Sequence, residues 1–227
     1  MAGTAQLLKV WAGAGGLAPL LSCGWLQQDG PQPPGCTPLR ALATLTGAIA
    51  GLLLILVGGL IPAAIPFHAL AGWDLRPLGI TLQVPALLLA ALVCGPRSAI
   101  LAAVAYLSVG LFQLPVFHEG GGIRYLLDPG FGYLAGFVPA GWVSGKLARQ
   151  NGMDDPLALA GAAAVGVLVL HLCGLTNLLL GALAGRWAAP WLDLVVNFSL
   201  ALLPQLLLCC AVGVAAWLLR RLLLVEP

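Results

Sequence analysis

The chain has 227 residues, of which 60% are hydrophobic and 8% are charged, and its mean hydropathy is +1.00. Soluble domains carry about 25% charged residues, so this composition excludes a soluble globular domain. The net charge of +2 gives no indication of a nucleic-acid partner. The sequence predicts an all-α integral membrane protein in contact with the lipid bilayer, and its length fits about six transmembrane helices of 17–25 residues.

The first forty residues differ from the rest of the chain. Residues 7–26 are moderately apolar but contain Lys9 and several glycines, and a polar, proline-rich stretch follows at 27–35. The apolar part continues past Cys23 without the small-residue cleavage site of a signal peptide. We therefore expect residues 1–40 to form a loosely ordered or interfacial extension, and residues 41–227 to form one six-helix transmembrane domain.

Three small residues lie at four-residue spacing near the start of the first apolar segment. Ala43, Gly47 and Gly51 share one face of the expected helix. Such a ridge lets two helices approach closely in lipid, and the second helix could belong to this chain or to a partner. A short polar hairpin near 66–77 should follow. The six expected spans are 41–65, 79–94, 99–113, 131–147, 156–183 and 192–219.

The distribution of lysine and arginine predicts the orientation in the membrane. With the N-terminus in the cytoplasm, seven basic residues lie inside and three lie outside, which is the bias of the positive-inside rule. Six spans then place the C-terminus in the cytoplasm as well. The inside residues are Lys9, Arg40, Arg97, Lys146, Arg149, Arg220 and Arg221, and the outside residues are Arg76, Arg124 and Arg186.

The loop between the third and fourth spans is the most distinctive stretch of the chain. Three consecutive glycines, Gly120, Gly121 and Gly122, allow the backbone to approach a ligand closely. Charged and aromatic residues surround them, and such a loop at a membrane must be buried in protein or face a water-filled cavity. We expect a ligand-binding loop, with an ordinary solvated hairpin as the alternative. Its notable side chains are Phe117, His118, Glu119, Arg124, Tyr125, Asp128 and Tyr133.

Polar side chains inside the spans are costly unless they are satisfied. Each of them could form a bond between helices, and His171 is interpreted as a satisfied core histidine, with a ligand role as the alternative. Gln83, Asn197 and Gln205 lie in segments that reach the outer face, which favours a pocket open to the exterior.

Several classes of protein are excluded by missing motifs. The chain has no phosphate-binding G-x-x-x-x-G-K-[ST], no H-E-x-x-H and no G-x-S-x-G, so we expect neither an enzyme nor a metal or cofactor site. The six cysteines contain no C-x-x-C pair. The spans lack the internal charges on which coupled transport usually depends, apart from Asp193 at one outer end. These features indicate a protein that binds a small molecule outside and takes its energy from elsewhere.

Residues 79–137 carry a set of motifs that resembles one family. The motifs, in chain order, are T-L-Q at 81–83, G-P-R at 95–97, Tyr106, L-P-V-F at 114–117, the three glycines and G-Y-L-A-G-F at 132–137. In this order they resemble the BioY family, the biotin-specific S component of energy-coupling factor (ECF) transporters. The resemblance extends over about residues 41–221 and is strongest over 79–137.

The resemblance implies a six-helix S component in the plasma membrane that binds biotin from the exterior. It also implies two kinds of partner, a membrane T component and two cytoplasmic ATPases that drive import. The ridge of Ala43, Gly47 and Gly51 resembles the surface that meets the T component. The implied ligand contacts are Phe117, His118, Glu119, Gly120, Gly121, Gly122, Tyr125 and Tyr133, with Gln83 from the second span.

One departure from the family pattern concerns the last span. Many members carry G-D-x-x-K there, and this chain has Leu-Pro-Gln-Leu-Leu-Leu-Cys-Cys at 203–210, which resembles the cyanobacterial-type variant. An amide offers both donors and acceptors to a ureido ring, so we expect Gln205, with Asn197, to replace the missing pair. Arg124 is the expected partner of the valerate carboxylate, because its guanidinium can bind it with two hydrogen bonds, and an ordinary surface arginine is the alternative. The alternatives are an S component for another vitamin and a membrane scaffold without a ligand.

Overall fold

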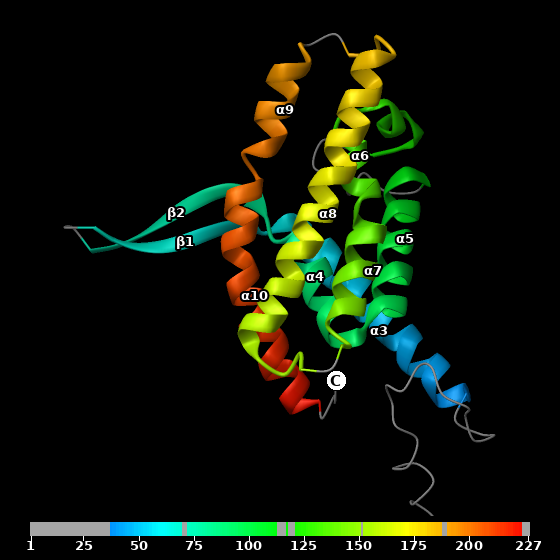
Figure 1. Ribbon diagram of the computed structural model, residues 1–227, viewed down its shortest axis with the longest axis vertical. Coiled ribbons are helices and arrows are strands. Elements are labelled where there is room, and N and C mark those ends of the chain that lie inside the picture. The colour runs from blue at the N-terminus through cyan, green and yellow to red at the C-terminus, as the bar shows by residue number, and fades with distance from the viewer. Residues whose placement is uncertain are drawn as a thin grey trace, which may run out of the picture.

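The computed structural model describes residues 37–69, 72–112, 117, 121–150, 152–187 and 190–223. The predicted extension lies outside these residues, apart from its last four, with which the first helix begins. The described residues form an elongated helical bundle with one β-hairpin projecting from its side (Figure 1). The elements in chain order are α3 (Thr37–Leu60), β1 (Pro62–Ala69), β2 (Gly72–Thr81), α4 (Gln83–Cys94), α5 (Pro96–Phe112), the 3-10 helix η1 (Ile123–Leu127), α6 (Phe131–Ala135), α7 (Phe137–Leu147), α8 (Pro156–Leu183), α9 (Trp191–Ser199) and α10 (Leu202–Leu222).

The helices match the six predicted spans. The fourth span is divided into α6 and α7 and the last into α9 and α10, while α3, α4, α5 and α8 take one span each. Among the described residues, the segments Arg40–Leu60, Pro156–Leu183 and Trp191–Leu222 are long and apolar enough to cross a membrane, and α4 and α5 are shorter apolar helices. Large apolar side chains are exposed along these helices, as on a surface that faces lipid. The helical membrane fold is confirmed.

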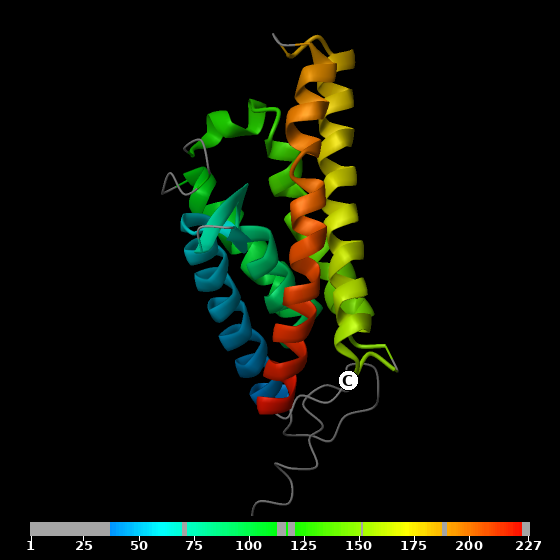
Figure 2. The ribbon, with the colours of Figure 1, turned by 90° about the vertical axis from the view of Figure 1, so that its left-hand side faces the viewer.

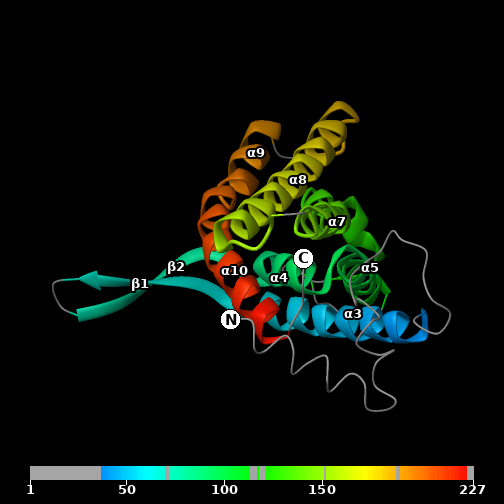
Figure 3. The same cartoon turned by 60° about the horizontal axis from the view of Figure 1, so that its bottom comes forward.

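Helix α4 lies at the centre of the bundle. It packs against α3, α5, α7, α8 and α10, which surround it in Figure 3. Its sequence is apolar on every side, as a helix buried all round must be. Leu87, Ala91 and Leu92 on α4 are completely buried. The central position of α4 explains why so short a helix holds the others together.

Small residues let neighbouring helices approach closely, as is usual inside membranes. A Cβ on Gly145 of α7 would lie 2.7 Å from the backbone nitrogen of Pro96. On α10, a Cβ at Gly213 would lie 2.5 Å from the Pro156 carbonyl oxygen and 2.7 Å from the Ala160 Cβ. The long helices α8 and α10 therefore pack antiparallel and nearly in backbone contact, side by side in Figure 2.

The β-hairpin corrects two parts of the prediction. The first span was expected to reach residue 65 and a short polar hairpin to follow, but α3 ends at Leu60 and two paired strands occupy Pro62–Ala69 and Gly72–Thr81. Their antiparallel register pairs Pro62 with Thr81 and Ala69 with Gly72. Proline is compatible with strands that have a free edge, and this sheet has only two strands. The fold is therefore not purely α-helical, and the second span begins at Gln83 rather than near Gly79.

One end of the bundle is closed by two arginines, and we call it the Arg end. Arg220 of α10 is 6% exposed and donates to the Leu92 carbonyl oxygen from Nε at 2.9 Å and from Nη2 at 2.7 Å. It also donates to the carbonyl oxygens of Ala148 at 2.7 Å and Met153 at 3.2 Å. These oxygens lie at or just beyond the C-terminal ends of α4 and α7, which favour a positive charge. Arg220 thus joins three helices.

Arg149 closes the same end beside Arg220. Its Nη2 donates to the Val93 carbonyl oxygen at 3.1 Å, and burial lowers the pKa of its guanidinium below the ordinary value. A Cβ on Gly95 would lie 2.8 Å from this Nη2, and Gly95 has φ +88°, where glycine is favoured. Glycine at this turn therefore leaves room for the arginine.

Candidate functional site

The glycine-rich loop is attached to the end of α5. The Gly122 amide donates to the Gly110 carbonyl oxygen at 2.9 Å, and Gly122 has φ +91°, which side chains rarely adopt. The ring of Phe117 fills the space that a Cβ on Gly110 would take, and Phe117 is 4% exposed. The loop thus inserts an aromatic ring into the bundle.

A first aromatic cluster forms around that ring. The Tyr106 ring lies 5.5 Å from Phe117, edge to face, and 6.0 Å from Phe137, stacked. Tyr125 of η1 packs on Phe117 with ring centroids 4.8 Å apart. The side chain of Gln83 lies beside Tyr106. Three predicted ligand residues, Gln83, Phe117 and Tyr125, therefore meet in one cluster, although Gln83 comes from α4 and the other two come from the segment between α5 and α6.

A second aromatic cluster surrounds Tyr133 on α6. Its ring stacks on Phe198 of α9 at 5.1 Å and meets the His171 ring edge to face at 5.5 Å. The ring also lies directly over Gly174 of α8, where any Cβ would overlap it. Tyr133 is thus held between α8 and α9 and is 9% exposed.

Four buried polar atoms near these clusters have no hydrogen-bond partner among the described residues. They are Gln83 Nε2, the Tyr133 hydroxyl, His171 Nε2 and Gln205 Oε1, and we call these four residues the polar layer. Buried polar atoms in native proteins are nearly always hydrogen-bonded, so these atoms need water or a ligand. Helices α4, α6, α8 and α10 each supply one of them. Unpaired polar groups inside an apolar bundle with aromatic side chains are typical of a small-molecule site.

Other predicted site residues lie elsewhere. Three of them are exposed: Arg124 on η1, Asn197 on α9 and Gly121 in the glycine-rich loop. None of the three belongs to the polar layer. His118, Glu119 and Gly120 lie outside the described residues. Gln205, in contrast, is buried on α10.

His171 is the member of the polar layer that sequence reasoning missed. It was interpreted as a satisfied core histidine, and it is 5% exposed, but only one of its ring nitrogens has a partner. Gly174 follows three residues later on the same helical face. The glycine leaves room for the Tyr133 ring beside His171, an arrangement that the sequence alone does not show.

The small-residue ridge of α3 packs within the chain at two of its three positions. A Cβ on Gly47 would lie 3.0 Å from Cys94 Cβ and 3.0 Å from Ser98 Oγ, and one on Gly51 would lie 3.1 Å from Ala102 Cβ. The ridge was expected to pack on a helix of this chain or of a partner, and at Gly47 and Gly51 it packs on helices of this chain. Ala43 is only partly buried.

Comparison with known proteins places the chain in a family. Residues 21–224 match the model of the BioY family. A biotin transporter BioY of Thermotoga maritima is 33% identical over 115 residues, which cover 50% of this chain and 68% of that protein. One of Rhodobacter capsulatus is 31% identical over 150 residues, 63% of this chain and 71% of that protein.

A solved structure supports the fold. The S-component for biotin from an ECF-type ABC transporter superposes with a TM-score of 0.62 over 80% of this chain and 93% of that one, at 21% identity. This likeness shows the fold, and the family match covers nearly the whole sequence from residue 21 onward. The chain is a multi-pass membrane protein that belongs to the BioY family.

Proposed function

We propose that the chain is the membrane-embedded biotin-binding subunit of an ECF-type uptake transporter. The observation that carries this proposal is the match of residues 21–224 to a family whose relatives are named biotin transporters. The shared fold with an S component for biotin supports it. Membership of a transporter family also agrees with the expectation that the protein is not an enzyme.

The proposed biotin site lies between the two aromatic clusters. Aromatic rings suit the apolar bicyclic ring and valerate chain, and the polar layer suits the ureido group. Gln205 is buried with an unpartnered Oε1, which supports its proposed role in place of the family's Asp and Lys. The proposed contacts are Gln83, Phe117, Tyr125, Tyr133 and Gln205, with His118, Glu119, Gly120, Gly121 and Gly122 from the loop.

Arg124 and Asn197 have a more peripheral place in this proposal. Both are exposed, on η1 and α9 respectively. An exposed guanidinium near the loop suits a carboxylate at the outer end of the ligand, so Arg124 is proposed to bind the valerate. Asn197 is proposed to contact the ligand only if α9 turns inward when biotin binds.

The proposed partners are a T component and two cytoplasmic ATPases. The Arg end of the bundle would face the cytoplasm, with both termini, and the protein would lie in the plasma membrane. On α3, Ala43 would contact the T component directly, while Gly47 and Gly51 would set the position of α3 through their contacts with α4 and α5. The chain carries no G-x-x-x-x-G-K-[ST] motif, and ATP hydrolysis is proposed to take place in the ATPase partners.

Co-purification tests the proposal against its alternatives. Biotin should remain bound, close to one molecule per chain, through purification in detergent from biotin-supplemented cells. Retention of a different vitamin would identify another S component, and retention of no small molecule would favour a scaffold. A control chain with Gln205→Ala, prepared in parallel, should retain less biotin.

A further inference from the structure

His171 presents a hydrogen-bond acceptor in the interior of the bundle. Its Nδ1 lies 3.0 Å from the Val167 carbonyl oxygen, and because a carbonyl can only accept, Nδ1 must carry the hydrogen. A neutral imidazole with hydrogen on Nδ1 has a lone pair on Nε2. A charged ring would be costly at this depth in an apolar bundle. The unpartnered Nε2 is therefore an acceptor without a donor.

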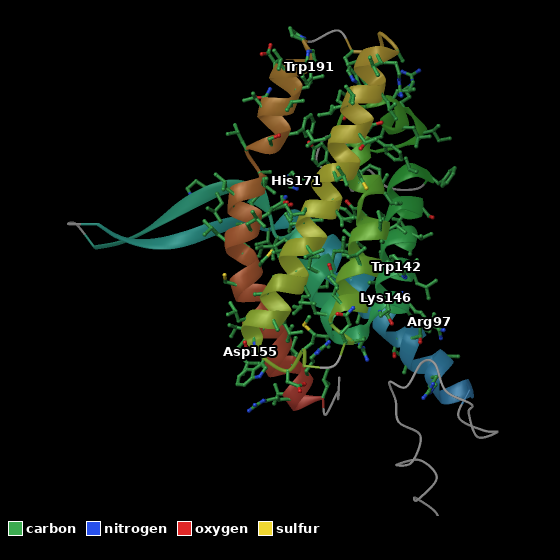
Figure 4. The ribbon with its side chains drawn as sticks, in the orientation of Figure 1. Arg97, Trp142, Lys146, Asp155, His171 and Trp191 are labelled. Atoms are coloured by element: carbon green, nitrogen blue, oxygen red, sulfur yellow. The ribbon has the colours of Figure 1, made fainter. Side chains whose placement is uncertain are left out.

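Gln205 lies close to the same level of the bundle as His171. Gly213 of α10 packs on Ala160 of α8, and the two helices run antiparallel (Figure 1). Gln205 lies eight residues before Gly213 on α10, and Leu168 lies eight residues after Ala160 on α8. Because the two helices are antiparallel, Gln205 is level with Leu168. His171 is three residues further along, about 4.5 Å of helix rise. Figure 4 draws His171 near the start of α10.

Gln83 reaches the same level from the centre of the bundle. Leu87 of α4 lies beside Gly141 of α7, and Ala91 lies beside Gly145. The two helices therefore run parallel, and neighbouring residues keep the same difference in residue number. This difference places Gln83 level with Phe137. In turn, Gly136 packs on the Leu170 carbonyl oxygen, one residue from His171. Gln83, His171 and Gln205 therefore lie within about one helical turn of one another along the bundle.

We infer that His171 is a direct ligand-binding residue that accepts a hydrogen bond from an N–H of the ureido ring, an inference that rests on the proposed biotin function. The polar layer offers two acceptors, His171 Nε2 and Gln205 Oε1, and one amide donor, Gln83 Nε2. A cyclic urea offers the complement, two N–H donors and one carbonyl acceptor. The Tyr133 hydroxyl can serve as donor or acceptor beside them.

Nitrogen NMR of the histidines tests this inference directly. The chain has three histidines, His68, His118 and His171, so ¹⁵N-histidine labelling gives few signals. The signals that disappear in His171→Phe are those of His171. Biotin should move the His171 Nε2 resonance upfield, as acceptance of a hydrogen bond does, and leave Nδ1 protonated. If biotin binds and this resonance does not move, His171 is not a ligand contact. If biotin does not bind at all, the proposed function fails as well.

Matched variants test the same contact by affinity. His171→Phe keeps a ring of similar size without the acceptor, and biotin affinity should fall about tenfold to a hundredfold. Thr176→Val is the control on the same helix, because the Thr176 hydroxyl is exposed and bonds only to the Leu172 carbonyl oxygen at 2.7 Å. The control should bind biotin like the parent chain. Equal affinity of the parent and a folded His171→Phe would overturn the inference.

Discussion

At the scale of residues, Gly174 determines where Tyr133 lies. The Tyr133 ring rests on the Gly174 backbone and is held from its other sides by His171 and Phe198. A methyl group on Gly174 would occupy the space of the ring. The position of one polar-layer hydroxyl therefore depends on the absence of a side chain on the neighbouring helix.

Gly174→Ala should therefore displace Tyr133 and destabilise the fold by about 1–3 kcal/mol, the usual cost of overpacking. Gly161→Ala on the same helix is the control, because nothing lies within 4 Å of the added methyl, and it should be neutral or slightly stabilising. Thermal unfolding in detergent and biotin titration would measure both. Equal behaviour of the two variants would contradict the described packing.

Gln205→Ala should lower biotin affinity about tenfold to a hundredfold, because it removes a buried amide from the proposed ureido contact. Cys210→Ala on the exposed side of the same helix should leave affinity unchanged. Isothermal titration of the three proteins compares them. An unchanged affinity for Gln205→Ala would remove Gln205 from the site.

Some residues of the aromatic clusters and the polar layer could be predicted from the sequence, and one could not, for a physical reason. Gln83 and Gln205 could be named because amides are unusual in apolar spans, and Phe117, Tyr125 and Tyr133 were implied by the family resemblance. His171 could not be predicted, because whether a histidine nitrogen is satisfied depends on the neighbouring helices. The exposure of Arg124 and Asn197 likewise depends on how η1 and α9 turn, which no residue pattern specifies.

At the scale of elements, Arg220 connects α10 to α4 and to the chain after α7. It donates to three carbonyl oxygens, of Leu92, Ala148 and Met153, and the first two belong to buried residues. The sequence placed Arg220 at a membrane boundary through the charge bias, but a charge count does not distinguish a buried guanidinium from one in solvent.

Arg220→Met should destabilise the fold by about 3 kcal/mol, since unpaired buried carbonyl groups lose bonds to a charged donor. Arg221→Met is the matched control one residue further on, where the side chain is exposed and its guanidinium lies 4.1 Å from the Trp217 ring. Arg221→Met should lower the free energy of unfolding by about 0.5–1 kcal/mol. Unfolding in a denaturant series measures the difference, and similar losses for both variants would contradict a bridging role for Arg220.

The β-hairpin is longer than the short polar hairpin that the sequence predicts near 66–77. The stretch 61–65 is apolar and continues the hydropathy of α3, so its pattern predicts helix there. Pro62 and Pro66 restrict the backbone, and the pairing with 72–81 depends on a partner strand that local periodicity does not reveal.

At the scale of the whole molecule, charge is distributed unevenly between the two ends. Figure 4 shows Arg97, Lys146 and Asp155 toward one end and Trp191 at the other, with His171 between them. Arg149, Arg220 and Arg221 lie with the first group, while Arg124 and Arg186 lie on the segments of the opposite end. By the positive-inside rule, the Arg end should face the cytoplasm.

A reporter fused after residue 227 tests this orientation. A C-terminal green fluorescent protein should fluoresce and a C-terminal alkaline phosphatase should be inactive, because the phosphatase matures only outside the cytoplasm. The reverse result would invert the orientation and place the polar layer nearer the cytoplasmic side.

Biotin binding is tested most directly by isothermal titration of the purified chain with biotin, desthiobiotin, thiamine and riboflavin. We expect one-to-one binding of biotin below micromolar concentration and no heat with thiamine or riboflavin. Absence of biotin binding, or tighter binding of another vitamin, would contradict this expectation and show that the altered last helix serves a different ligand.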